Sequence, residues 1–132
     1  MPMPMLLCVG AINTFLIEKK LRGYVSINVQ SGEALDTHSF ATLIGVGATT
    51  VNPYLAFDSL YQRYEKKLFG QYSFDECVER YIKSVNAGLL KIMSKMGISV
   101  LSSYRGGCNF ETVGLSRSIV DDYFPGVTSK IS

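Results

Sequence analysis

Tryptophan is absent from this sequence of 132 residues, histidine occurs once and cysteine occurs three times. The cysteines, Cys8, Cys77 and Cys108, stand far apart and form no CxxC pair. An odd number at this spacing predicts neither a disulfide framework nor a zinc site, and we expect reduced, buried thiols. The single histidine, His38, has no second metal ligand beside it in the sequence, so no metal site is predicted.

A strong charge imbalance is also missing, because 13 basic residues face 11 acidic ones and the net charge is +2. So small a charge excludes the basic patch typical of a nucleic-acid or membrane-surface binder. The pairs Lys19-Lys20 and Lys66-Lys67 each fall near the end of an expected helix, where cations meet the negative end of the helix dipole. We therefore expect no nucleic-acid partner.

Long apolar runs are missing as well. The stretch 5–17 is interrupted by Asn13 and Thr14 and is too short to cross a bilayer. Residues 1–7 are apolar, but they have no positively charged region and no small-residue cleavage site, so they predict no signal peptide. We expect a soluble, cytoplasmic protein without a membrane partner.

Enough apolar material is present for a folded core. Hydrophobic residues make up 47% of the chain and charged residues 18%. Disordered chains combine low hydrophobicity with high net charge, and this chain shows neither. The chain either folds or belongs inside something that folds.

Helices and short strands alternate along the sequence. Helical spacing of apolar residues predicts helices over 5–21, 36–44, 54–68, 73–97 and 116–124, and extended segments are expected over 24–29, 49–52 and 98–101. This order favours an α/β architecture with short parallel strands. Only two or three strands are predicted, which leaves sheet edges and apolar helix faces uncovered. Residues 1–132 are therefore interpreted as one segment without internal boundary, an incomplete portion of a larger α/β domain.

Two of these helices support detailed predictions. Ser73 and Glu76 predict a capping box at the start of the helix over 73–97. Gly88 inside that helix costs about 1 kcal/mol relative to alanine, and a closely packed neighbour would explain it. The helix over 54–68 is expected to turn these residues inward: Leu55, Leu60, Tyr61, Tyr64 and Leu68.

A glycine pair at Gly45 and Gly47 invites comparison with a phosphate-binding turn. The pair follows a helix instead of leading from a strand into one, and neither a third glycine nor a Lys-Ser/Thr pair completes the motif. The C-terminal end of a helix is the favoured interpretation.

The most suggestive candidate site is the segment Ser103–Gly107, which follows the expected strand over 98–101. Ligand sites of α/β proteins form at the C-terminal ends of strands, where Arg105 would clamp a carboxylate or phosphate. The alternative is that Arg105 pairs with a neighbouring acid or binds a carbonyl at a domain interface. The alternative is favoured, because no acid, base or nucleophile converges there. The candidate interface or anion contacts are Tyr104, Arg105, Gly106 and Asn52.

No catalytic, cofactor-binding or metal-binding residue is predicted. The adjacent pair Asp121-Asp122 points in different directions on a helix, so the two carboxylates do not face a common ligand. Met93 and Met96 are interpreted as core residues and not as a cofactor site.

Longer motifs cover the chain almost from end to end. They include Ser31-Gly32-Glu33-Ala34, Leu43-Ile44-Gly45-Val46-Gly47-Ala48, Val51-Asn52-Pro53-Tyr54-Leu55-Ala56, Gly88-Leu89-Leu90-Lys91-Ile92-Met93-Ser94-Lys95-Met96-Gly97-Ile98-Ser99 and Ser103-Tyr104-Arg105-Gly106. In this set the chain resembles the glutamate synthase large subunit, and it is similar to the later part of the central domain, before the FMN-binding barrel.

The resemblance implies a parent enzyme that makes glutamate from glutamine and 2-oxoglutarate with reducing equivalents from NAD(P)H or ferredoxin. It implies an amidotransferase domain on one side of this segment and a flavin domain, with FMN and an iron–sulfur cluster, on the other. No cofactor is expected in the segment, whose partners would be these two domains. Its own role would be a non-catalytic scaffold, and the isolated fragment is expected to self-associate through uncovered apolar faces.

Two stretches depart from the family pattern. Ile12-Asn13-Thr14-Phe15 replaces a run that is often histidine-rich, and Gly107-Cys108-Asn109 replaces Ala-Gln-Ile. Any role of these positions at substrate or at the ammonia path is therefore in doubt. The alternative function, motivated by Met1 at the start of the chain, is a free-standing binding or assembly module with Arg105 as an anion contact.

Overall fold

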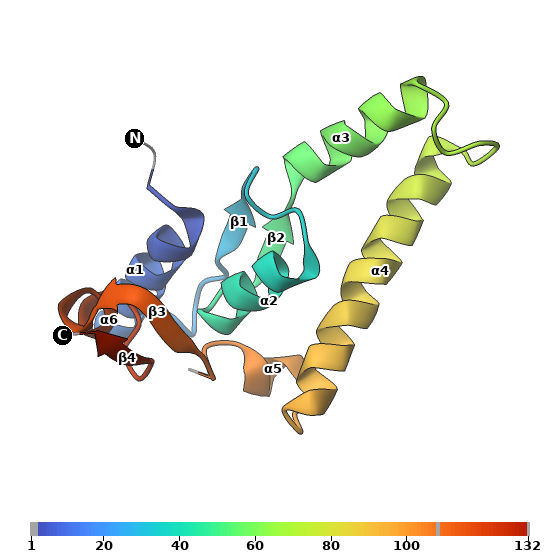
Figure 1. Ribbon diagram of the computed structural model, residues 1–132. Helices are drawn as coiled ribbons and strands as arrows, with labels where there is room; N and C mark the ends of the chain where they lie inside the picture. The colour runs from blue at the N-terminus through green and yellow to red at the C-terminus, as the bar shows by residue number, and fades with distance from the viewer. Residues whose placement is uncertain (1–2, 108, 132) are drawn as a thin grey trace.

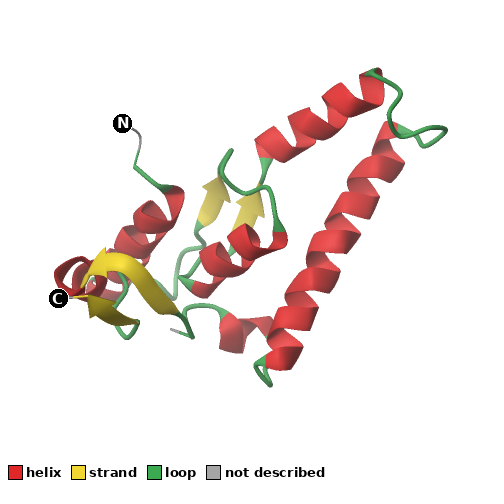
Figure 2. Cartoon of the chain, viewed as in Figure 1, coloured by secondary structure: helices red, strands yellow, loops and turns green. Residues whose placement is uncertain are grey.

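The computed structural model describes residues 3–107 and 109–131, so the predictions for Met1 and Cys108 lie outside the described residues. This part of the chain forms six helices and four short strands. Figures 1 and 2 show how they are arranged. In chain order they are α1 (Met5–Glu18), β1 (Asn28–Gln30), α2 (Thr37–Gly45), β2 (Thr50–Asn52), α3 (Tyr54–Glu65), α4 (Phe74–Lys95), α5 (Leu101–Tyr104), β3 (Glu111–Ser116), α6 (Arg117–Tyr123) and β4 (Thr128–Ile131).

The strands form two separate two-stranded parallel sheets. β1 pairs with β2 in the register Val29 to Val51, and β3 pairs with β4 in the register Glu111 to Thr128. Each pair is joined through one helix, α2 in the first and α6 in the second, as parallel strands require a crossover. The predicted α/β class with short parallel strands is confirmed, and the chain is a partial α/β domain.

The larger core forms where α1, the β1–β2 sheet and α2 meet α4. Its buried residues are Val9, Ile27, Val29, Ala34, Phe40, Leu43, Ala48 and Val85. In Figure 1, α3 and α4 extend away from this core and are joined at their far ends by the loop over 66–73. The two helices touch through aromatic side chains, with the ring centres of Tyr61 and Phe74 5.4 Å apart.

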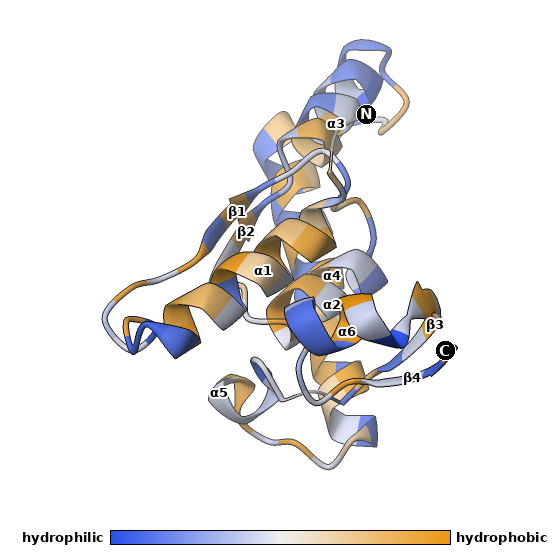
Figure 3. Ribbon diagram, turned by 90° about the vertical axis from the view of Figure 1, so that its left-hand side faces the viewer, coloured by the Kyte–Doolittle hydropathy of each residue, from blue (hydrophilic) through white to orange (hydrophobic). Residues whose placement is uncertain are grey.

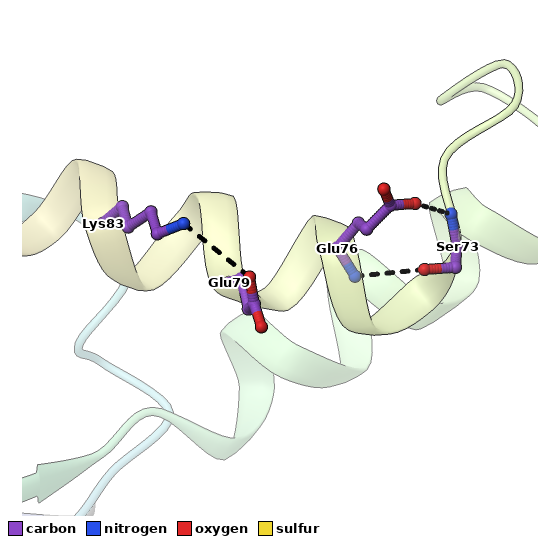
Figure 4. Close-up of polar contacts among 4 residues, drawn as sticks. All are labelled: Ser73, Glu76, Glu79 and Lys83. Carbon is purple, nitrogen blue, oxygen red and sulfur yellow. Dashed lines mark hydrogen bonds and ion pairs between the residues drawn. The ribbon is translucent and has the colours of Figure 1, made fainter.

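The predicted capping box at the start of α4 is confirmed and is drawn in Figure 4. The Ser73 backbone N–H donates to Glu76 Oε2 at 2.8 Å, and the Glu76 backbone N–H donates to Ser73 Oγ at 3.3 Å. These bonds satisfy two donors that a helix N-terminus otherwise leaves unpaired, and they lower the pKa of Glu76. Asp36 caps α2 in the same way, because the backbone N–H of Ser39 donates to its carboxylate at 2.8 Å.

Replacing Ser73 with alanine removes the capping hydroxyl, and we expect it to lower the free energy of unfolding by about 1 kcal/mol. Urea denaturation followed by circular dichroism measures the change. Ser84→Ala is the matched control, because Ser84 is exposed in the middle of the same helix. Equal stabilities of the two variants would show that the capping box contributes nothing.

Gly88 is tolerated in α4 because α2 packs directly against it. A Cβ atom at this position would lie 2.8 Å from Thr37 Oγ1 and 2.5 Å from Thr37 Cγ2. Such separations are shorter than any normal contact, so the close neighbour predicted from the sequence is confirmed.

The ends of α1 and α3 lie at the two lysine pairs. Lys19 and Lys66 are the C-terminal caps, and the next residues, Lys20 and Lys67, adopt positive φ angles of 59° and 55°. The placement of the lysine pairs at helix ends is confirmed. The first helix was expected over 5–21, but α1 ends three residues earlier, at Glu18.

Several strand predictions need correction. The expected strand over 98–101 is wrong, because Leu101 already begins α5 and no strand is present at 98–100. The strand expected over 24–29 is shortened to Asn28–Gln30, because only these residues pair with β2. Strands β3 and β4 were not predicted. Each depends on a partner far along the chain, and β3 carries a glycine that weakens the local signal.

The inward face predicted for α3 is wrong for three of its five residues. Ala56 is the buried residue of this helix, whereas Leu55 is 43% exposed, Tyr61 51% and the following Leu68 65%. Leu60 and Tyr64 are half-buried, and the rings of Tyr61 and Tyr64 contact Phe74 of α4, so this face is covered only in part by the described residues. This face is therefore available for a surface outside this segment.

Candidate functional site

The segment Ser103–Gly107 was predicted to follow a strand, but it begins inside the single-turn helix α5 and continues past its end. Arg105 is the residue that caps α5, and Gly106 follows with a φ of +68°, a conformation that favours glycine. The ligand-site rule for strand ends therefore does not apply here.

Tyr104 is the buried anchor of this segment. Its side chain is 1% exposed, and its hydroxyl donates to the backbone carbonyl of Ala41 in α2 at 2.8 Å. The ring meets Phe110 edge-on, with 6.1 Å between the ring centres. Burial raises the pKa of the Tyr104 hydroxyl, so it stays protonated and remains a donor at neutral pH. Tyr104 thus fastens the chain after α4 onto α2.

Arg105 is half-buried, and its Nε atom is fully buried without a hydrogen-bond partner among the described residues. The ion pairs found in this part of the chain, Lys83–Glu79 and Lys130–Glu111, do not include it. A buried guanidinium N–H without an acceptor is costly. That Arg105 is an interface or anion contact therefore stays a prediction.

The structure does not bring the four candidate residues together. Asn52 ends β2 and lines a groove beside α4. Gly106 lines a different cavity, of about 70 Å³, next to Asn13 and Phe124. Tyr104 lines neither. The set does not form one site, because the residues on which the prediction was based occupy separate elements.

An apolar groove lies beside Asn52. Its volume is about 450 Å³, within the range of small-molecule and peptide sites. It lies between β2, α2 and the facing sides of α3 and α4, and is lined by Phe40, Ile44, Thr49, Thr50, Val51, Asn52, Pro53, Phe57, Tyr81, Ile82, Val85, Asn86 and Leu89. None of these side chains is charged. Sequence analysis missed this groove because four separate elements form it, and residues 40 and 89 of its lining are far apart in the chain.

A second feature that sequence analysis missed is the set of hydrogen bonds that the Arg22 guanidinium donates to three parts of the chain. Its Nε donates to Asn13 Oδ1, its Nη1 to the Val25 carbonyl and its Nη2 to the Gly47 carbonyl, each at 2.7 Å. One side chain thus ties α1, the loop before β1 and the turn before β2. A lone arginine in a loop carries no sequence signal for this role.

Replacing Arg22 with alanine breaks all three bonds, and we expect a loss of roughly 2 kcal/mol in unfolding free energy. Arg22→Lys recovers little, because an ammonium lacks the planar fork that reaches three acceptors. Chemical denaturation measures both variants. Arg63→Ala, an exposed arginine of α3, is the control and should stay near the parent stability. Full rescue by lysine would contradict the assigned geometry.

The first stretch that departs from the family pattern, residues 12–15, makes hydrogen bonds to other elements. In α1, Asn13 accepts the Arg22 bond described above, and the Thr14 hydroxyl donates to the Tyr123 carbonyl at 3.4 Å. In the second stretch, Gly107 and Asn109 are exposed, and Cys108 lies outside the described residues.

The chemistry available in the described residues is limited. Within 3–107 and 109–131, no three His, Cys, Asp or Glu side chains lie close enough to hold a metal ion. Cys8 and Cys77 are free thiols on different helices, α1 and α4. No helix in the same ranges is long and apolar enough to cross a membrane.

Comparison with known proteins finds relatives along nearly the whole chain. It is 54% identical over 129 residues to the glutamate synthase (NADPH) large chain of Azospirillum brasilense, 98% of this chain and 8% of the relative. It is 48% identical over 130 residues to the corresponding chain of Bacillus subtilis (strain 168), again 98% of this chain and 8% of the relative. Ferredoxin-dependent glutamate synthase 1 of Arabidopsis thaliana is 44% identical over 138 aligned residues, 98% of this chain and 8% of the relative.

The family comparison agrees with these relatives. A family model described as the glutamate synthase central domain matches residues 1–116. The chain spans about 8% of the length of the relatives, so further domains are present in those proteins. The motifs from Ser31 to Gly106 that suggested a resemblance lie inside the matched region. The chain is a glutamate synthase central-domain segment and belongs to that family.

Proposed function

We propose that this chain is part of a glutamate synthase that converts glutamine and 2-oxoglutarate to glutamate. Its own role in that enzyme is to hold the amidotransferase and flavin-binding domains in register, without carrying out chemistry. The cytoplasm is the proposed compartment. The observation that supports the scaffold role above all is the amount of apolar surface that this segment leaves uncovered.

Several helices and strands expose large apolar side chains. On α1, Ile12 is 50% exposed and Phe15 and Ile17 are each 54% exposed; Val113 on β3 is 90% exposed. Figure 3 shows α1 in front, coloured as hydrophobic over most of its length. Exposed apolar side chains that gather on one element are typical of a protein–protein or domain interface. The α3 face described above adds to it.

The two small sheets support the same interpretation. A two-stranded sheet is marginal in stability, and its outer edges present unpaired backbone groups. Parallel sheets are normally covered on both faces. The segment therefore has the features of a domain portion that is completed by the rest of a longer chain.

Within 3–107 and 109–131, the residues do not fit the cofactors of the parent enzyme. An iron–sulfur cluster needs several cysteine thiolates in one place, and Cys8 and Cys77 belong to different helices. The Gly45–Gly47 turn ends helix α2 instead of opening one, so it offers no helix N-terminus to a flavin phosphate. We therefore assign FMN and the cluster to other parts of the enzyme.

Binding measurements on the 132-residue chain test its non-catalytic role. We expect isothermal titration calorimetry to detect no binding of FMN or glutamine. A yellow preparation with one flavin per chain would overturn the proposal. Self-association, measured by sedimentation velocity, is the expected by-product of the uncovered apolar faces.

The alternative is a free-standing small binding module, which the partnerless Nε of Arg105 favours. It predicts a measurable affinity for a carboxylate or phosphate that Arg105→Ala abolishes. An unchanged affinity in that variant counts against the module.

The native mass of the polypeptide separates the two functions. An antibody against residues 88–99 should detect a band far larger than 14.6 kDa in source cells if the segment belongs to a large chain. A band at 14.6 kDa alone would reject the scaffold proposal and favour the module.

A further inference from the structure

The groove defined above runs along one edge of strand β2. Five consecutive residues line it, Thr49 to Pro53. Because successive side chains of a strand point to opposite faces of the sheet, a groove over one face would be lined by every second residue. Consecutive lining residues place the groove along the strand edge, on the side away from β1.

Backbone hydrogen bonds identify which groups face the groove. The Thr50 N–H donates to the Ile27 carbonyl at 3.3 Å, and the Asn52 carbonyl accepts from the Ser31 N–H at 3.2 Å. Residues 50 and 52 thus turn their backbone groups toward β1 and its flanks. The backbone of Val51, between them, points to the opposite edge. Among the described residues β1 is the sole strand neighbour of β2, so this edge is open.

The wall opposite β2 is apolar and is formed by one face of α4. Tyr81, Ile82, Val85 and Leu89 supply it, and Phe40 of α2 closes one side. Ile82 is 43% exposed although it lies in a concave, apolar place. With no charged side chain in the lining, the groove offers nothing to select a charged ligand. An open backbone edge facing an apolar wall matches an uncharged, extended peptide segment.

The chain lengths indicate where that segment comes from. This chain spans 8% of the large chains to which it is similar, so most of each relative lies outside the structure. We propose that the groove receives an extended, apolar segment from the remainder of the glutamate synthase large chain. That segment pairs with the open edge of β2 and packs against α4. The proposal rests on the proposed function and names a contact by which the rest of the enzyme holds this segment.

Site-specific photo-crosslinking in the intact large chain tests the occupant. Benzoylphenylalanine in place of Ile82 should, on irradiation, attach to a peptide of the large chain outside residues 1–132. The neighbouring residue Lys83, 78% exposed and outside the groove lining, is the control position. Benzoylphenylalanine in place of Lys83 should not give that crosslinked product. A crosslink only to residues 1–132 of a second copy, or none to any peptide, overturns the proposal.

Hydrogen exchange gives a second measurement that requires no substitution. In the intact large chain, the Val51 amide should exchange within about tenfold of the rate of the paired Thr50 amide. Fast exchange of Val51 beside a protected Thr50 would show an open edge and overturn the proposal. Either negative result leaves the scaffold role standing if the native mass is large. A native mass of 14.6 kDa instead removes the scaffold role itself.

Discussion

Replacing Tyr104 with alanine should lower the free energy of unfolding by about 3–5 kcal/mol, the cost of removing a large buried aromatic side chain. Tyr104 is 1% exposed and packs with Ile44, Met93 and Phe110. Removing it opens a cavity between α2, α4 and α5 that these neighbours fill only in part. Chemical denaturation followed by circular dichroism measures the loss.

Tyr104→Phe separates packing from hydrogen bonding in the same place. This variant keeps the ring and loses only the bond to the Ala41 carbonyl, so we expect a loss of about 1 kcal/mol. It also stays measurable if the alanine variant does not fold. If alanine costs no more than phenylalanine, Tyr104 does not anchor the segment after α4.

The second large effect is expected from Gly10→Ala in α1. Helix propensity alone predicts that this change stabilises the chain by about 1 kcal/mol. Packing predicts the opposite sign, because the added Cβ would lie 2.7 Å from the Tyr123 carbonyl oxygen and overlap the Phe124 ring. The carbonyl belongs to the backbone and cannot rotate away, so α6 must shift from α1. We expect a net destabilisation of about 1–3 kcal/mol.

Gly23→Ala is the matched control for this substitution. A Cβ at Gly23 meets no atom within 4 Å, so the variant should stay within about 0.5 kcal/mol of the parent. Thermal unfolding of the two variants side by side decides the sign. A stabilised Gly10→Ala variant would show that α1 and α6 do not pack closely in solution.

The proposed role predicts different effects for substitutions at buried contacts and for substitutions on the exposed apolar surfaces. Tyr104 and Gly10 lie where elements of this segment pack against one another, whereas Phe15 is 54% exposed and Ile82 43% exposed. Substitutions of the first kind should alter the 132-residue chain itself. Substitutions of the second kind should have their main effect in the large chain, where we propose that other segments cover these positions.

Local signals predicted the helices well, for an identifiable reason. Asp36 and Ser73 cap helices through residues only three positions away, and Gly88 lies in a helix whose period is visible in one stretch of sequence. Helical hydrogen bonds join residues four apart, so the residues that decide a helix are neighbours in the chain. For the same reason α4 begins at its predicted capping box.

Strands and site contacts could not be predicted as well, because they depend on distant residues. The expected strand over 98–101 has the composition of a strand but no partner, and its last residue begins α5. β3 was missed because its partner β4 lies beyond an intervening helix. Arg105 and Asn52 were grouped as one kind of contact, yet they belong to different parts of the fold.

Residue order alone determined the α/β class, the helix starts and the resemblance to the glutamate synthase central domain, because capping, periodicity and long motifs are properties of consecutive residues. The tertiary structure decided which apolar faces are buried, that the strands form two separate pairs, and that an uncharged groove follows the edge of β2. These features depend on contacts between residues that are far apart in the chain. The apolar face of α3 illustrates the difference, since its periodicity is visible in the sequence, whereas its exposure depends on what packs against it.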